Sequence, residues 1–449
     1  MVINRFDISI EKKLLPFKED IEVDADKSMS IRSFLIGSIC NGISFTKNVL
    51  ESDDVLSAIK CLKKLGVKIL KKKSGNYKIY GNGLGSLIIK RNNSLNFGNS
   101  GTLARLLIGI LTTTPNIQIK LGGDHSLNKR NMKELINLMS EFGANFFPKK
   151  KFTFPLKIES AKMPIGIKYF AGSSAQLKSA VIFAALNSSG NTKIFELERS
   201  RNHTENMLMK NSQAIKIKDK INNKSIAIKG KQYLNPINID VPGDPSSAAF
   251  FTALTLLNNN SKLRIKSVGL NPTRIGFYKL LKRHGAKIKL KNFKKINNEI
   301  RGDIHVESCK IKPIRASKEY YVNSTDEYPI LFVIASLTKG ISVFKGIKGL
   351  ANKESNRIKE MQNIFKQIGI KTVAKGDSLK IFGKEKFNAN HKKIYVPNLG
   401  DHRICMSSFV LAVITGTKAK IKNFETVNTS SPSFLKIIKS LGAKYEIQK

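Results

Sequence analysis

Six apolar runs of ten to fifteen residues recur along the chain, each just after a turn that contains serine or aspartate. These runs are apolar almost all round, so they predict helices that are buried on every side. The serine or aspartate at the start of each run predicts a side-chain N-cap. The six starts lie near Ser28, Ser100, Ser173, Ser246, Asp326 and Asp401, at intervals of 72 to 80 residues. This regular spacing indicates six copies of one structural unit.

A second, amphipathic helix follows in most units and ends at a glycine. Charged residues fall on one face, and Leu, Ile, Phe or Met recur at i, i+3 and i+4 on the other. The glycine predicts a left-handed C-terminal cap, and a short β-like string follows it. The clearest segments are 53–66, 131–143, 274–285, 357–369 and 432–442. Each unit therefore predicts a β-α-β-α-β-type module. Because so small a module rarely folds alone, we expect two lobes of three modules each, with a seam near residue 240.

The composition adds a strong positive charge but no sign of a nucleic-acid site. The 449 residues carry a net charge of +45, with 64 lysines and 14 arginines spread along the whole chain. Aromatic residues are not interleaved with basic clusters, as a base-stacking surface requires. We therefore expect no nucleic-acid partner, and a diffuse cationic surface that attracts small polyanionic substrates.

Nothing in the sequence predicts a membrane segment or an export signal. No stretch of eighteen apolar residues occurs, and the first residues lack the basic and apolar regions of a signal peptide. The cysteines lie far apart without metal-ligand spacing, at Cys40, Cys61, Cys309 and Cys405. We therefore expect a cytoplasmic protein with reduced thiols, no membrane association and no metal site.

Nine motifs occur in an order that is typical of one known family. They are "DKSMSIR", "FGNSGTLAR", "SSAQLKSA", "SRNHTENML", "VPGDPSSAAFF", "NPTR", "DEYPIL", "NKESNRI" and "DHRICMS", between residues 26 and 408. On these motifs the chain resembles the enolpyruvyl transferases over nearly its whole length. The resemblance implies an α/β fold of two lobes, an inside-out α/β barrel with three repeated units per lobe, whose interior helices point their N-termini toward the inter-lobe cleft. Lobe 1 would comprise residues 1–21 plus 242–449, and lobe 2 residues 22–241.

Within that family the motifs are most similar to the branch that uses shikimate 3-phosphate. The resemblance implies transfer of the enolpyruvyl group of phosphoenolpyruvate to the 5-hydroxyl of shikimate 3-phosphate, with release of phosphate, by addition and elimination. This step belongs to the shikimate pathway of chorismate and aromatic amino acid biosynthesis. The resemblance implies no metal or organic cofactor, and a monomer whose partners are its two small-molecule substrates.

The resemblance also assigns roles to the motif residues. Asp326 would take the proton from the 5-hydroxyl, Glu354 would exchange the proton at the enol methylene, and Lys27 would contact both substrates. The shikimate 3-phosphate site would comprise Lys27, Ser28, Arg32, Ser174, Ala175, Gln176, Arg201, Asp326 and Lys353. The phosphoenolpyruvate site would comprise Lys27, Asn99, Gly101, Arg130, Gln176, Arg357 and Arg403.

The arginines are the most informative of these residues. Because lysine is so abundant here, a positive charge alone does not require arginine, whereas a two-point grip on a carboxylate or phosphate does. Among the 14 arginines, the resemblance draws attention to Arg32, Arg105, Arg130, Arg201, Arg357 and Arg403. For Arg105, a structural role within its helix and a ligand contact both stay open.

Other assignments have structural alternatives. Asp326 precedes an apolar run, so it is also a candidate helix cap, and its neighbour Glu327 is a rival for the proton-accepting role. The motif "NKESNRI" is also typical of an ordinary exposed helix with i, i+4 pairs. We expect His402 to be structural.

Three positions depart from the family pattern. Many members have a second serine where Ala175 stands, and we expect Lys178 and Arg201 to supply compensating charge. The usual aspartate of one motif is Asn356, which we expect to weaken a contact to the arginine that follows. Thr429 stands where some members have a lysine that helps to hold phosphoenolpyruvate.

Two other functions and an inactive homologue are the alternatives. Sister enzymes that use UDP-N-acetylglucosamine carry a reactive cysteine in a glycine-rich loop, and the corresponding residues 122–130 contain none. An RNA-binding protein related to RNA 3′-phosphate cyclases would suit the charge but not the six-unit length. The change at Asn356 motivates an inactive homologue, yet both candidate carboxylates and the arginines remain.

Small residues at the start of the second apolar run predict a close approach to a ligand. Residues 99–102 would let backbone N–H groups reach an anion at the helix N-terminus. By resemblance Gly101 lines the phosphoenolpyruvate pocket, which the family's inhibitor glyphosate also occupies. We therefore expect the protein to be a glyphosate target, and Gly101→Ala to reduce inhibition more than substrate use.

Overall fold

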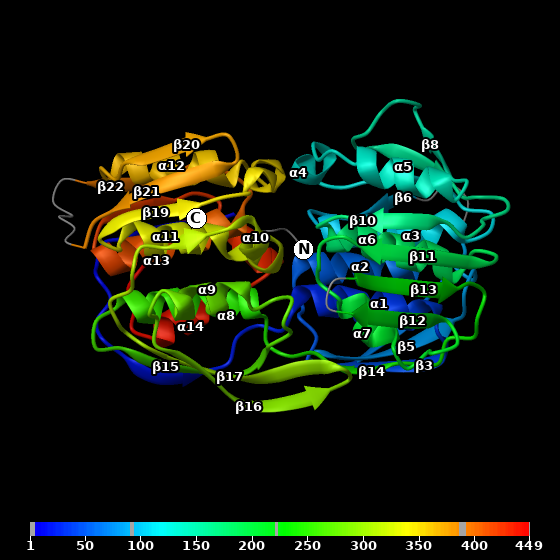
Figure 1. Cartoon of the computed structure of the whole chain (residues 1–449), viewed down its shortest axis with the longest axis horizontal. Coiled ribbons are helices and arrows are strands. Elements are labelled where there is room, and N and C mark those ends of the chain that lie inside the picture. Colours follow the sequence, from blue (N-terminus) through cyan, green and yellow to red (C-terminus); the bar gives the residue numbers. More distant parts are fainter. Residues whose placement is uncertain (1–4, 90–93, 221–222, 386–391, 449) are drawn as a thin grey trace. The chain divides into compact units, whose positions relative to one another are not determined.

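Six four-stranded sheets, three in each of two units, account for the repeat in the sequence (Figure 1). The computed structural model describes residues 5–89, 94–220, 223–385 and 392–448. In every sheet one edge strand is parallel to its neighbour, and that neighbour is antiparallel to the third strand. The prediction of six β-α-β-α-β-type units is therefore confirmed.

The strands are short, and several alternate between buried and exposed residues, as β7 (Gln118–Gly122) and β11 (Asn191–Glu196) do. The sheets of unit 2 are β14 (Asn238–Asp240), β3 (Asn41–Lys47), β5 (Asn76–Asn82), β4 (Lys68–Lys73); β6 (Ser94–Asn96), β7 (Gln118–Gly122), β9 (Leu156–Glu159), β8 (Asn145–Phe147); and β10 (Lys168–Ala171), β11 (Asn191–Glu196), β13 (Asn223–Lys229), β12 (Ile215–Lys220). Those of unit 1 are β16 (Ile288–Ile296), β17 (Glu299–Glu307), β15 (Lys262–Gly269), β2 (Lys18–Ile21); β18 (Arg315–Ala316), β19 (Gly340–Phe344), β21 (Ser378–Gly383), β20 (Thr372–Lys375); and β22 (Lys393–Val396), β23 (Lys418–Ile421), β1 (Asp7–Ile10), β24 (Glu446–Gln448).

Six interior helices are buried over most of their length, as their all-round apolar composition predicts. They are α1 (Lys27–Ile39), α3 (Gly101–Thr113) and α6 (Ala175–Leu186) in unit 2, and α8 (Pro245–Leu257), α11 (Tyr328–Ser336) and α13 (His402–Thr415) in unit 1. The side chains of Asp26, Ser100, Ser174, Asp244 and Asp401 cap five of them. The other, α11, follows the 3-10 turn η1 (Thr325–Glu327) with Glu327 at its N-cap position, so Asp326 is not its helix cap.

Five outer helices are amphipathic, and each ends at a glycine with positive φ. They are α2 (Asp53–Lys64), α5 (Lys133–Glu141), α9 (Gly276–Arg283), α12 (Arg357–Gln367) and α14 (Phe434–Ser440). The second helix of the remaining unit, α7 (His203–Leu208), is short and buried at every residue except Asn206. The glycines are Gly66, Gly143, Gly285, Gly369 and Gly442, as predicted. Shorter elements are α4 (His125–Asn128), α10 (Lys318–Ser324), η2 (Lys348–Asn352) and η3 (Phe424–Thr429). In the described residues no helix is both long and apolar enough to span a membrane.

Each unit has its own hydrophobic core. Unit 1 comprises Met1–Asp24, Pro242–Lys294 and Ile300–Lys449, and unit 2 comprises Ala25–Val241 and Lys295–Glu299. The chain leaves unit 1 after β2, which pairs with β15, and leaves unit 2 after β14, which pairs with β3. In this division the first segment of unit 1 ends at Asp24. Asp24 accepts hydrogen bonds in unit 1 from the backbone N–H groups of Asp244 (2.8 Å) and Ser433 (3.0 Å).

Candidate active site

In unit 2, the predicted ligand-binding residues on α1 begin at its first residue. The ammonium group of Lys27 lies 2.9 Å from a carboxylate oxygen of Asp54, near the start of α2. Asp54 is buried, whereas Lys27 and the following Ser28 are partly exposed. The buried carboxylate therefore orients the Lys27 side chain, which stays 16% exposed.

Arg32, one turn further along α1, is buried and held by neutral oxygens. Its Nε donates to Thr204 Oγ1 in α7 (2.8 Å), and its NH2 donates to Ser179 Oγ in α6 (3.2 Å). Its NH1 donates to the carbonyl oxygen of Ser28 (3.1 Å). The two hydroxyls also hydrogen-bond to each other at 2.8 Å. These partners fix the orientation of the guanidinium without adding negative charge, which suits a group that binds an anion.

A second set of polar residues joins the starts of α3 and α6. Arg105 NH1 donates to the Gly101 carbonyl oxygen (3.2 Å) and to Gln176 Oε1 (3.0 Å). Gln176 Nε2 in turn donates to Thr102 Oγ1 (2.9 Å). Arg105 therefore has a clear structural role, because it holds Gln176 in place at the start of α6.

Arg130 approaches the same place from the loop after α4. Its NH2 donates to Asn99 Oδ1. A Cβ atom added at Gly101 would lie 2.8 Å from Arg105 NH1 and 2.9 Å from Arg130 NH1. The structure thus brings Asn99, Gly101, Arg130 and Gln176 together, with two guanidinium groups against the glycine.

The start of α6 and the loop before α7 hold the remaining predicted residues of unit 2. Ser174 caps α6, Ala175 is its first residue, and Arg201 lies partly buried just before α7. Lys178 does not supply charge near Ala175, so that expectation is wrong. The Lys178 ammonium group is completely buried and paired with the carboxylates of Glu196 and Glu205.

In unit 1, Arg357 is the centre of an ionic cluster at the starts of α12 and α13. Its Nε and NH2 donate to the two carboxylate oxygens of Asp401 at 2.9 and 3.3 Å, a two-point contact. Asp401 also caps α13 by accepting from the Arg403 N–H (2.9 Å). Burial opposes the charge of Arg357, but Asp401 and Glu354 hold the pKa of its guanidinium above the ordinary value.

Two partly exposed carboxylates complete this cluster. Glu354 accepts a hydrogen bond from Arg357 NH2 at 2.6 Å, and Asp326 lies 3.8 Å from Arg357 NH1. Their side chains are 18% and 24% exposed. The rival Glu327 is buried and accepts a hydrogen bond from Ser246 Oγ. The geometry therefore favours Asp326 over Glu327 as a group that reaches a substrate.

Other predicted residues of unit 1 are linked to this cluster by sequence or by one contact. Arg403 is buried, and within the described chain its Nε and NH1 have no hydrogen-bond partner. Lys353 is partly exposed directly after η2. Thr429 Oγ1 lies 3.4 Å from Nδ1 of the buried His402, and it donates to a backbone carbonyl of its own turn.

Asn356 has a local role that its sequence context did not reveal. Its side-chain oxygen caps α12 by accepting from the Lys359 N–H at 3.1 Å. Asparagine and aspartate cap helices about equally well. The expected weakening of a contact to Arg357 therefore has no basis here, because Arg357 is held by Asp401 and Glu354.

The same residues, elements and order of motifs lead to one family. The family model described as "EPSP synthase (3-phosphoshikimate 1-carboxyvinyltransferase)" matches residues 12–438. The chain belongs to the EPSP synthase family.

Relatives of this chain within the EPSP synthase family match it over nearly its whole length. The 3-phosphoshikimate 1-carboxyvinyltransferase of Zymomonas mobilis is 34% identical over 441 residues, which span 98% of this chain and 97% of that protein. The structure of EPSP synthase from Acinetobacter baumannii matches with a TM-score of 0.84 and 33% identity, over 99% of this chain and 100% of that one. The enolpyruvyl transferase NikO from Streptomyces tendae has a TM-score of 0.73 at 11% identity, over 99% of each chain, and shares the fold. The predicted family and fold class are therefore confirmed.

Two supporting carboxylates were not predicted as part of the EPSP synthase site. Asp54 lies in "SDDVL", where acidic residues at a helix start are common, so no local signal distinguishes it. Asp401 was predicted only as a helix start, although its motif also contains Arg403. Both were missed because their partners, Lys27 and Arg357, are distant in sequence.

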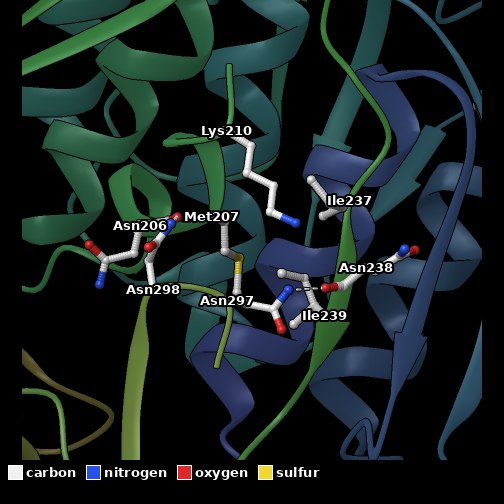
Figure 2. A pocket seen from close by; sticks show the side chains of 8 residues that line it. All are labelled: Asn206, Met207, Lys210, Ile237, Asn238, Ile239, Asn297 and Asn298. Atoms are coloured by element: carbon white, nitrogen blue, oxygen red, sulfur yellow. Dashed lines mark hydrogen bonds between the residues drawn. The ribbon is translucent and has the colours of Figure 1, made fainter. Parts of the chain in front are cut away.

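A separate hollow in unit 2 contains none of the predicted residues (Figure 2). Side chains of α7 and residues 237–239 line it, together with residues 297 and 298 at the tip of the β16–β17 hairpin. Asn297 closes part of its rim by donating a hydrogen bond to the carbonyl oxygen of Asn238.

Proposed function

We propose that this chain transfers the enolpyruvyl group of phosphoenolpyruvate to the 5-hydroxyl of shikimate 3-phosphate and releases inorganic phosphate. The observation that carries the proposal is the cluster around Arg357. It combines buried guanidinium groups with two carboxylates that stay partly exposed. In the described chain, NH1 of Arg357 and Nε and NH1 of Arg403 have no hydrogen-bond partner. Buried N–H groups of this kind are suited to donate to a carboxylate or phosphate.

Asp326 and Glu354 carry the two proton transfers in this proposal. Asp326 takes the proton from the 5-hydroxyl as the oxygen bonds to C2 of phosphoenolpyruvate, and Glu354 gives a proton to the methylene carbon. In the tetrahedral intermediate that results, C2 bears both the phosphate and the shikimate oxygen. A methyl proton then returns to Glu354 as the bond to phosphate breaks, and the proton held by Asp326 passes to the departing phosphate. These transfers leave the enolpyruvyl ether and restore both carboxyl groups.

The cations bind and orient the two anionic substrates. We assign phosphoenolpyruvate to Lys27, Asn99, Gly101, Arg130, Gln176, Arg357 and Arg403. We assign shikimate 3-phosphate to Lys27, Ser28, Arg32, Ser174, Ala175, Gln176, Arg201, Asp326 and Lys353. Fixed guanidinium groups favour the transition state because they need not reorganise as charge moves onto the departing phosphate.

Product identification tests this proposal. The purified protein is incubated with both substrates, and the mixture is followed by proton and phosphorus NMR. We expect vinyl protons of a new enolpyruvyl ether to appear in step with an equal amount of inorganic phosphate. Phosphate release without the ether would indicate a phosphatase and contradict the proposal.

We also propose that the protein is a cytoplasmic monomer. Its four cysteines are free thiols, as is typical of a reducing compartment. Light scattering on the purified protein should give a mass near 50.0 kDa. Twice that mass would contradict the monomer.

A further inference from the structure

Four charged side chains form a buried cluster beside α7 in unit 2. They are Lys178 of α6, Glu196 at the end of β11, Glu205 of α7 and Lys224 of β13. Lys178 Nζ contacts Glu196 Oε1 and lies 2.7 Å from Glu205 Oε1, and Lys224 Nζ lies 2.7 Å from Glu196 Oε2. Two positive and two negative charges therefore balance in the interior. Burial opposes the charge of Glu196, but the two lysines hold its pKa below the usual value.

Two members of the cluster, Lys178 and Glu205, are sequence neighbours of residues that hydrogen-bond to Arg32. Glu205 follows Thr204, whose hydroxyl accepts from Arg32 Nε at 2.8 Å. Lys178 precedes Ser179, whose hydroxyl accepts from Arg32 NH2 at 3.2 Å. The Lys178–Glu205 ion pair therefore joins α6 to α7 at the point where their hydroxyls hold Arg32.

The other side of the cluster adjoins Arg201. Glu196 Oε1 accepts hydrogen bonds from both the backbone N–H and the hydroxyl of Ser200, each at 3.0 Å. Ser200 directly precedes Arg201. The buried carboxylate therefore fixes the backbone from which the Arg201 side chain extends.

The helix α7, which carries Thr204 and Glu205, depends on contacts with the rest of unit 2 for its position. With six residues, α7 is too short to be stable through its own hydrogen bonds, so contacts with the rest of the unit must place it. Besides Glu205, His203 supplies such a contact, because its Nδ1 lies 2.8 Å from Glu299 Oε1.

We propose that Lys178, Glu196 and Glu205 are positioning residues that orient Arg32 and Arg201 toward the anionic groups of shikimate 3-phosphate. This inference rests on the proposed function, which assigns both arginines to that substrate. Buried ion pairs contribute little net stability, because the cost of removing charges from water offsets their attraction. Their effect here is on geometry. Lys178 and Glu205 each lie next to a residue whose hydroxyl accepts a hydrogen bond from Arg32. Glu196 accepts hydrogen bonds from the residue that precedes Arg201.

The test compares the two substrates in the full-length protein. The double variant Lys178→Met/Glu205→Gln removes one positive and one negative charge together and leaves the Glu196–Lys224 pair. We expect the KM and the calorimetric Kd for shikimate 3-phosphate to rise about tenfold, the equivalent of one charge-assisted hydrogen bond. The KM for phosphoenolpyruvate should stay within about twofold. No member of the cluster is the sequence neighbour of Asn99, Gly101, Arg130 or Gln176, the residues brought together at the starts of α3 and α6.

A matched control and a milder variant complete the experiment. Asp219→Asn breaks the exposed Arg199–Asp219 pair (2.8 Å) in the same repeat and should leave both KM values unchanged. Ser200→Ala removes one hydrogen bond beside Arg201 without stranding a charge. It should raise the KM for shikimate 3-phosphate alone, even if the double variant fails to fold.

Two results would overturn the inference. The first is a shikimate 3-phosphate KM within twofold of wild type in the folded variants. The second is an equal rise in both KM values, which indicates a merely structural role. Failure of the proposed function is distinguishable, because it appears in the wild-type protein as no binding of shikimate 3-phosphate and no phosphate release.

Discussion

At the scale of single residues, the carboxylates near Arg357 differ in their exposure to solvent, although they look equivalent in the sequence. Asp326 and Glu327 are adjacent carboxylates before the same helix, yet Asp326 is partly exposed beside Arg357 and Glu327 is buried against Ser246. Asp401 is buried and holds Arg357 at two points. The buried Asp401 is therefore assigned to orienting the arginine, and the partly exposed Asp326 and Glu354 are the carboxylates that we propose for proton transfer.

Asp326→Asn and Glu354→Gln should each lower kcat by about 10²- to 10⁴-fold, because each removes a group that transfers a proton. Binding of shikimate 3-phosphate, measured by calorimetry, should persist in both variants. Glu327→Gln is the matched control, and it should lower the free energy of unfolding rather than kcat. Near-full turnover in either of the first two variants would show that its role is misassigned.

At Gly101, one added methyl group should affect the binding of glyphosate more than the binding of phosphoenolpyruvate. A methyl group there would lie under 3 Å from the guanidinium groups of Arg105 and Arg130, so one or both must shift. We expect Gly101→Ala to raise the inhibition constant of glyphosate more than the KM of phosphoenolpyruvate. Steady-state inhibition of both proteins measures this, and equal inhibition would argue against placing Gly101 in that pocket.

Charge partners at this scale could not be predicted from the sequence. Lys178 looks like one of 64 interchangeable lysines, and only its distant partners Glu196 and Glu205 explain its complete burial. Asp54 escaped notice for the same reason. The motif arginines stood out instead because they occur in a chain that otherwise uses lysine.

At the scale of secondary structure elements, the sequence predicted helices better than strand partners. The interior helices followed from all-round apolar composition, and the outer ones from their amphipathic faces and glycine caps. The pairing of β2 with β15 and of β14 with β3 could not be predicted, because each joins strands separated by about 200 residues or more. The six-residue length of α7 was also not predicted. Its position depends on contacts with residues distant in sequence, such as Glu299, which the local sequence does not show.

The packing of α3 against α6 gives a prediction at this scale. A Cβ atom at Gly109 would lie 2.5 Å from the Ala180 carbonyl oxygen and 2.8 Å from its Cα, so backbone would have to move. Gly109→Ala should lower the free energy of unfolding by about 1–3 kcal/mol. Urea denaturation measures it, with Gly122→Ala as control, because a Cβ there meets nothing within 4 Å. Equal midpoints for both variants would contradict this packing.

At the scale of the whole molecule, the chain carries a net charge of +45, and only a few of its cations are arginines with a specific role. Lysines spread along the chain create a positive potential that salt screens, whereas the buried Arg357 and Arg403 are screened much less. The overall charge should therefore affect the capture of anionic substrates more than the chemical step.

Salt should consequently raise KM without lowering kcat. Between about 0.05 and about 0.5 M potassium chloride, we expect the KM of both substrates to rise several-fold, as the Debye length falls below about 10 Å. Sucrose at matched osmolality controls for solvent effects. An unchanged KM would mean that the excess lysine has no part in substrate capture.

The most direct test of the proposed function is phosphate release by the purified protein with phosphoenolpyruvate and either of two acceptors. With shikimate 3-phosphate, we predict one phosphate released for each acceptor consumed, and with UDP-N-acetylglucosamine none. No release with shikimate 3-phosphate, or release only with UDP-N-acetylglucosamine, would contradict it.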